Sequence, residues 1–165
     1  MAHKTVYLAL GSNLGDRRFN LRRACEALED ARVHIVKRSS IYETEPRDVT
    51  AQPWFLNMAL ACETPYFPLQ LLAISQRIER DLGRIRGASS VPRGPRTLDI
   101  DILLFQNIVM DTPRLTIPHP RMLDRRFVLE PLSEIAPHLR HPQTKDLLAK
   151  YLSRVAGQKL RRIEL

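Results

Sequence analysis

The sequence lacks the features of a secreted or membrane-embedded protein. Its two cysteines, Cys25 and Cys62, each lie in an apolar pattern without the close spacing of metal ligands. Buried, reduced thiols are therefore expected, which indicates a cytoplasmic protein. No stretch approaches the roughly 20 apolar residues of a membrane span. The apolar run near the start is too short for a secretory signal, so we expect no contact with a membrane.

The sequence also lacks the common glycine-rich phosphate-binding motifs. Neither Gly-x-x-x-x-Gly-Lys-Ser/Thr nor Gly-x-Gly-x-x-Gly occurs. Residues 11–16 contain two glycines between a predicted strand and a predicted helix, but they have no lysine and the wrong spacing. We interpret them as a tight turn. Any bound nucleotide must then be held by side-chain cations and metal ions rather than by a P-loop.

Positive charge is in excess, since 26 Lys and Arg face 18 Asp and Glu, for a net charge of +8. This balance predicts a polyanionic partner, either nucleic acid or a small polyphosphate. A basic RNA-binding module is one candidate, but such modules stack bases on aromatics of a Lys/Arg-Gly-Phe type motif. That motif is missing here. The arginines instead crowd residues 84–126, beside a pair of aspartates.

That pair lies in the most informative segment, residues 94–105, which predicts a strand buried on both faces. Because strand side chains alternate, Asp99 and Asp101 should share one face with Leu103 and Phe105. The opposite face should carry Leu98, Ile100, Ile102 and Leu104. Neighbouring carboxylates repel one another, and burial penalises both unless a cation holds them. Their Cα atoms should lie about 6.6 Å apart, which suits shared magnesium ions. A structural ion pair with Arg84 and Arg96 is the alternative.

The pattern along the chain predicts one domain, residues 1–165, with an α+β, ferredoxin-like β-α-β-β-α-β fold. Two helices should cover one side of its sheet. Strands are expected at residues 5–10, 33–43, 55–63 and 98–105; helices should start at Asp16 and Pro68, the second ending at Gly83. We expect a lid at residues 84–97, a hairpin at Gln106-Asn107, short helices at 127–135 and 145–152, and an edge strand or helix in the tail 153–165.

Six segments together resemble the 6-hydroxymethyl-7,8-dihydropterin pyrophosphokinase family, in register over nearly the whole chain. They are Leu-Ala-Leu-Gly-Ser-Asn-Leu-Gly at 8–15, Phe-Leu-Asn at 55–57, Arg84-x-Arg86, Gly-Pro-Arg-Thr-Leu-Asp-Ile-Asp-Ile at 94–102, Leu-Thr-Ile-Pro-His-Pro at 115–120 and Arg125-x-Phe127. Pro120 departs from the pattern, because some members have tyrosine there. The resemblance implies transfer of the β,γ-diphosphate of ATP to the pterin's hydroxymethyl oxygen, with release of AMP, in folate synthesis.

The resemblance also implies roles for individual residues. Asp99 and Asp101 would bind two Mg²⁺ ions, and Asp101 would accept the proton of the attacking hydroxyl. Arg84 and Arg96 would stabilise the charge on the transferred group. The nucleotide side would comprise Gln76, Glu79, Arg84, Arg86, Arg96, Ile102 through its backbone, Arg114, Thr116, His119 and Arg125. The pterin side would comprise Thr44, Phe55, Asn57, Asp101 and Phe127.

Plainer interpretations of the same residues stay open. Phe55 and Phe127 could be core aromatics, and His119, between two prolines, could be an ordinary loop residue. Asn57 is harder to dismiss, because an amide in a buried strand needs partners. A metal-dependent phosphohydrolase is a further possibility, since carboxylate-magnesium sites also serve hydrolysis. With ATP and the pterin as its partners and no nucleic acid, we expect this small basic domain to be a monomer.

Overall fold

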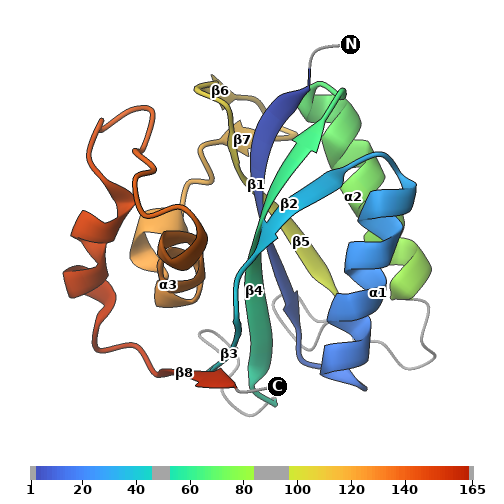
Figure 1. Ribbon diagram of the computed structural model, residues 1–165, viewed down its shortest axis with the longest axis horizontal. Coiled ribbons are helices and arrows are strands. Elements are labelled where there is room, and N and C mark those ends of the chain that lie inside the picture. The colour runs from blue at the N-terminus through green and yellow to red at the C-terminus, as the bar shows by residue number, and fades with distance from the viewer. Residues whose placement is uncertain (1–2, 46–52, 84–96, 164–165) are drawn as a thin grey trace.

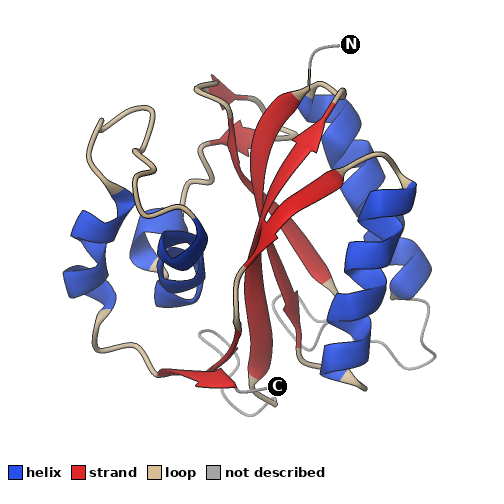
Figure 2. Cartoon of the chain, in the orientation of Figure 1, coloured by secondary structure: helices blue, strands red, loops and turns tan. Residues whose placement is uncertain are grey.

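A six-stranded antiparallel sheet has helices on both of its faces (Figures 1 and 2). The computed structural model describes residues 3–45, 53–83 and 97–163. Its elements are β1 Lys4–Ser12, α1 Arg17–Asp30, β2 His34–Arg38, β3 Ile41–Thr44, β4 Phe55–Thr64, α2 Pro68–Leu82, β5 Asp99–Phe105, β6 Met110–Asp111, β7 Thr116–Ile117, η1 Met122–Asp124, α3 Arg126–Ile135, η2 Leu148–Val155 and β8 Leu160–Ile163. None of the helices in these ranges is both long and apolar enough to span a bilayer.

The strand order is β5-β1-β4-β3-β8, and β2 pairs with β4 beyond the end of β3. With β2 and β3 counted as one interrupted strand, elements β1 to β5 follow the predicted β-α-β-β-α-β order, which confirms the α+β, ferredoxin-like fold. In Figure 1, α1 and α2 lie to the right of the sheet, and α3 and η2 lie to the left. The second helical layer adds to the predicted arrangement, in which two helices covered one side.

The predicted helix boundaries are confirmed where short-range chemistry sets them. The Asp16 carboxylate caps α1 by accepting the Phe19 N–H at 3.1 Å. Pro68 is the first residue of α2, and Gly83 ends that helix by donating its N–H to the Glu79 carbonyl at 2.8 Å. Cys25 and Cys62 are buried and unpaired, as predicted, and burial raises the pKa of the Cys62 thiol to about 12.

The predicted strand 33–43 is wrong as one continuous element, because it breaks at Ser39. The Ser39 hydroxyl accepts the Ala59 N–H at 2.8 Å, and the Ser39 N–H donates to the Ala59 carbonyl at 2.9 Å. A side chain thus replaces a backbone acceptor in the ladder. β2 and β3 therefore pair with different stretches of β4, residues 60–63 and 55–57 respectively.

The predicted alternation in β5 fails after Ile102, at a β-bulge. Tyr7 and Leu8 are adjacent in β1, but they face Leu104 and Ile102, which leaves Leu103 as an extra residue. Leu103 and Leu104 therefore both belong to the core under α3, and Phe105 belongs to the core under α1 and α2. The prediction had placed Leu104 and Phe105 on the opposite faces.

The C-terminal third also departs from prediction in two places. A turn forms at Gln106-Asn107, with Gln106 at φ 50°, but it directs the chain out of the sheet. β6 then pairs with β7 instead of returning along β5. The helix expected at 145–152 is η2, three residues later, because Lys145 has a left-handed φ of 66°. The tail forms the edge strand β8, which pairs with β3.

Candidate active site

Two rows of residues cross the sheet and bring the aspartate pair together with the predicted pterin-binding amide. The rows are Asp99–Gly11–Asn57–Tyr42 and Asp101–Ala9–Ala59. Directly opposed residues of antiparallel strands point to the same face of a sheet. Ala59 lies in the core under α3, and Tyr42 donates a hydrogen bond to Glu134 of that helix. Asp99, Asp101 and Asn57 therefore all lie on the α3 face of the sheet.

The amide of Asn57 has the partner that its burial demands. Asn57 and Thr44 are both buried, and the Asn57 Nδ2 donates to the Thr44 Oγ1 at 2.6 Å. Phe55, paired with Thr44 across the strands, is half-buried rather than enclosed in the core. The structure therefore brings together the three residues that sequence reasoning assigned to the edge and wall of a pterin slot.

Gly11 is a site residue that the sequence reasoning missed. A Cβ at position 11 would lie 2.9 Å from the Asn57 Oδ1 and 3.7 Å from the Phe55 ring. Glycine is thus required for the Asn57 side chain to lie across β1. A signal existed, because a glycine inside a strand pattern often marks such a close approach.

His119 lies next to the aspartate pair. The backbone N–H of His119 donates to the carbonyl of Leu103 in β5 at 2.9 Å. The ring Nδ1 of His119 accepts the backbone N–H of Arg121 at 3.2 Å. Burial lowers the pKa of His119, the Asp101 charge raises it, and the Arg125 and Arg121 charges lower it, with a net decrease. The net decrease favours the neutral ring, and because Nδ1 accepts the Arg121 N–H, the proton of that neutral ring lies on Nε2.

Arg125 and Phe127 lie at the start of α3, on the same side of the sheet. The Arg125 guanidinium stacks over the Phe127 ring, 5.4 Å from its centroid. Phe127 is half-buried at the edge of the α3 core. The Arg125 charge also lowers the pKa of His119, so Arg125 lies within electrostatic reach of both Phe127 and His119.

Of the two predicted nucleotide residues on α2, Glu79 meets the edge of β5 rather than the α3 face. The Glu79 carboxylate accepts the Ile100 N–H at 2.8 Å, and Gln76 is exposed on the same helix. The Ile102 side chain is buried in the core under α1 and α2. Only its backbone is thus available to a nucleotide, as the prediction required.

The remaining predicted residues divide into two groups. Arg114 is exposed between β6 and β7, and the Thr116 hydroxyl donates to the Asp111 carboxylate at 3.2 Å, so both residues belong to the β6–β7 pair. Arg84, Arg86 and Arg96 lie outside the described residues, and so does the predicted lid except Thr97.

The aspartate pair fits magnesium by its chemistry. Asp99 and Asp101 are half-buried, share one face and offer only oxygen atoms. Within residues 3–45, 53–83 and 97–163, no cluster of three or more His, Cys, Asp or Glu forms a closed metal cage. Two carboxylates without a cage are typical of magnesium sites that substrate phosphates complete. Thr97, buried two residues before Asp99, has a hydroxyl without a hydrogen-bond partner in the described part of the chain.

Comparison with known proteins shows the family to which the chain is related. A sequence model of the 7,8-dihydro-6-hydroxymethylpterin-pyrophosphokinase family matches residues 7–137. The chain belongs to this family. The resemblance read from its motifs is thereby confirmed, and with it an ATP-dependent diphosphotransferase.

Relatives of similar length carry the corresponding enzyme name. A Bacillus subtilis protein named 2-amino-4-hydroxy-6-hydroxymethyldihydropteridine pyrophosphokinase is 48% identical over 140 residues, which cover 84% of this chain and 82% of that protein. A Pseudomonas aeruginosa protein of the same name is 43% identical and covers 86% of both chains.

Other relatives are longer. The chain spans 25% of a pea protein named a folate synthesis bifunctional protein, to which it is 42% identical over 79% of its own length. It also covers 46% of a Plasmodium falciparum HPPK-DHPS chain, with a TM-score of 0.76 at 15% identity. That structural likeness supports the fold described above.

Proposed function

We propose that the protein transfers the β,γ-diphosphate of ATP to the hydroxymethyl oxygen of 6-hydroxymethyl-7,8-dihydropterin, within a single domain, residues 1–165. A bond forms between that oxygen and the β-phosphorus, the bond from the β-phosphorus to the oxygen bridging it to the α-phosphorus breaks, and AMP leaves. The observation that carries the proposal is the common face of Asp99, Asp101 and Asn57, with His119 beside Asp101.

Asp99 and Asp101 would hold two Mg²⁺ ions between their carboxylates and the phosphate oxygens of ATP. Bound magnesium would neutralise phosphate charge and make the attacking hydroxyl easier to ionise. Asp101 would take the proton from that hydroxyl. It is paired with Ala9, further inside the sheet than the Asp99–Gly11 pair, and it lies next to His119. His119 would donate a hydrogen bond from its Nε2–H to a phosphate oxygen.

The pterin would be recognised by hydrogen-bonding groups of Asn57 and Thr44 that their mutual hydrogen bond leaves available. One amide proton of Asn57 binds the Thr44 hydroxyl oxygen, so the Asn57 Oδ1 and second amide proton can face the ligand. The Thr44 hydroxyl proton can donate as well. Half-buried Phe55 and Phe127 would stack on the flat ring system.

Positive charge would hold the nucleotide in place of a P-loop. Arg125 and Arg121 lie within electrostatic reach of His119. Arg84, Arg86 and Arg96 would add charge on the transferred group. Arg114 and Thr116 would reach the ribose and phosphates, and Gln76, Glu79 and the Ile102 backbone would line the nucleotide's base side. Charge neutralisation and positioning supply most of the acceleration in phosphoryl transfer.

Phosphorus NMR of the protein with ATP, Mg²⁺ and 6-hydroxymethyl-7,8-dihydropterin tests the reaction directly. We expect AMP and a pterin diphosphate to appear together, and neither to appear when the pterin is left out. ADP or inorganic phosphate as product would instead indicate a kinase or a phosphohydrolase on the same carboxylates. Unchanged ATP together with salt-dependent oligonucleotide binding would favour the RNA-binding alternative.

A further inference from the structure

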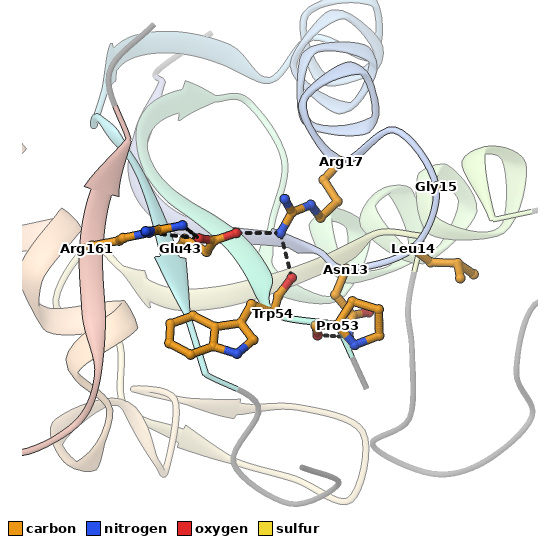
Figure 3. Close-up of a pocket in the computed structure, with 8 residues that line it drawn as sticks. All are labelled: Asn13, Leu14, Gly15, Arg17, Glu43, Pro53, Trp54 and Arg161. Carbon is orange, nitrogen blue, oxygen red and sulfur yellow. Dashed lines mark hydrogen bonds and ion pairs between the residues drawn. The ribbon is translucent and has the colours of Figure 1, made fainter. Parts of the chain in front are cut away.

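The sheet face opposite the proposed pterin slot holds a buried carboxylate between two arginines from distant parts of the chain (Figure 3). Glu43 of β3 is 8% exposed. Its Oε2 accepts a hydrogen bond at 2.9 Å from Nη1 of Arg17, the first residue of α1. Its Oε1 accepts hydrogen bonds from both Nε and Nη2 of Arg161 in β8. We call these three residues the Glu43 clamp.

The Glu43 clamp also reaches the backbone that leads into β4. Arg17 Nη1 donates to the Trp54 carbonyl at 2.8 Å, and the Asn13 side chain donates to the Pro53 carbonyl at 3.0 Å. Figure 3 shows both bonds beside a hollow of about 640 Å³ lined by the same residues. These two hydrogen bonds tie the backbone of residues 53 and 54 to side chains at the start of α1 and the end of β1.

The held backbone is continuous with the proposed pterin residues. Glu43 precedes Thr44, and Trp54 precedes Phe55, and Thr44 and Phe55 are paired across the two strands. We propose that the Glu43 clamp is a positioning device for the pterin site, through which the C-terminal strand β8 contributes to pterin affinity. This inference rests on the proposed function. β8 lies beyond residues 7–137, so the family match does not include it.

Electrostatics explain why all three members are needed. Burial alone raises the pKa of Glu43, but the hydrogen bonds and charges of Arg161 and Arg17 outweigh that effect and lower it. Removal of one arginine leaves a buried carboxylate with too little compensating charge. The strand end can then relax toward water, and it carries Thr44 with it.

The variant Arg161→Met tests the proposal, because the Arg161 side chain is 74% exposed and its loss should leave the protein folded. We expect the pterin Kd, measured by ligand fluorescence, and the pterin KM to rise about tenfold. The Kd of a non-hydrolysable ATP analogue and the KM of ATP should stay within about twofold. Arg161→Lys keeps the charge but loses the planar guanidinium, so its pterin Kd should lie between those of the unmodified protein and Arg161→Met.

Lys159→Met is the matched control, since it removes one positive charge just before β8 and Lys159 is exposed. Glu43→Gln removes the central charge while keeping the side-chain shape. It should reproduce the selective loss of pterin affinity. A lowered melting temperature with unchanged pterin binding would overturn the proposal, as would equal weakening of both ligands. Failure of the unmodified protein to form pterin diphosphate would refute the proposed function instead.

Discussion

The two faces of the six-stranded sheet use the same three strands in different ways. Toward α1 and α2, the strands present large apolar side chains, namely Leu8, Leu10, Met58, Leu60, Ile100 and Ile102, all nearly or fully buried. Toward α3, the rows one residue along present Ala9, Gly11, Asn57, Ala59, Asp99 and Asp101. The first face supplies close packing, and the second exchanges packing for space and polar groups. The contrast teaches that the closely packed face toward α1 and α2 holds the strands in place, so that the face toward α3 can carry polar groups for a ligand.

Asp101→Asn should break the α3 face chemically and have the largest effect. The substitution keeps the side-chain size but removes charge and basicity, so kcat should fall about 10³-fold. The melting temperature should change little, because Asp101 is only half-buried. The assay is AMP formation with the pterin present. Asp30→Asn, at an exposed position at the end of α1, is the control and should retain full activity.

Leu60→Ala should break the opposite face and leave chemistry intact. Leu60 is fully buried under α1 and α2, so truncation should lower the free energy of unfolding by about 2–5 kcal/mol. Urea denaturation measures that loss. The kcat of the molecules that remain folded should match that of the unmodified protein. A fall in kcat as large as that of Asp101→Asn would contradict the division of labour between the faces.

Gly11→Ala should sharpen the comparison, because it adds one methyl group to the α3 face. The new Cβ would meet the Asn57 Oδ1 at 2.9 Å and displace the amide. We expect a stability loss of about 1–3 kcal/mol and weaker pterin binding with unchanged affinity for ATP. Calorimetric titration of each ligand measures this. Gly157→Ala is the matched control, because its Cβ would meet no atom within 4 Å.

The smallest effect should be the loss of stability when the pH is lowered and Glu43 takes up a proton. The folded pKa of Glu43 is lowered, so its charge stabilises the protein above the unfolded pKa, and that contribution is lost as pH falls through the folded pKa. The free energy of unfolding, measured from pH 6 to pH 3, should fall further in the unmodified protein than in Glu43→Gln. Parallel pH profiles would show that Glu43 is not stabilised by its arginines.

The correct predictions rest on interactions between residues close in the chain. The Asp16 cap, the Pro68 start and the Gly83 end each depend on neighbours within one helical turn. The predictions failed where a partner strand intervenes. The predicted strand 33–43 breaks at Ser39 because both hydrogen bonds of Ser39 to the Ala59 backbone come from β4. The bulge at Leu103 places Leu104 and Phe105 on the faces opposite to those predicted. Neither partner is visible in a local pattern.

The candidate site divides in the same way. The Asp99–Asp101 spacing and the buried amide of Asn57 pointed to metal and ligand chemistry before any fold was known. The resemblance assigned His119 to the nucleotide, but only the structure shows it beside Asp101, since no spacing rule joins residues 18 positions apart. The roles of Arg84, Arg86 and Arg96 stay predictions, because these residues lie outside the described ranges.

By itself, the sequence determined the order of the main elements up to β5, the start of α1, both ends of α2, the acidic strand and the family. Each of these depends on local chemistry or on a motif read in order. The tertiary structure alone decided that Gly11 makes room for Asn57, that α3 covers the second face, and that Arg17 and Arg161 meet at Glu43. Contacts between residues as far apart as 43 and 161 depend on strand register, which only the packed sheet sets.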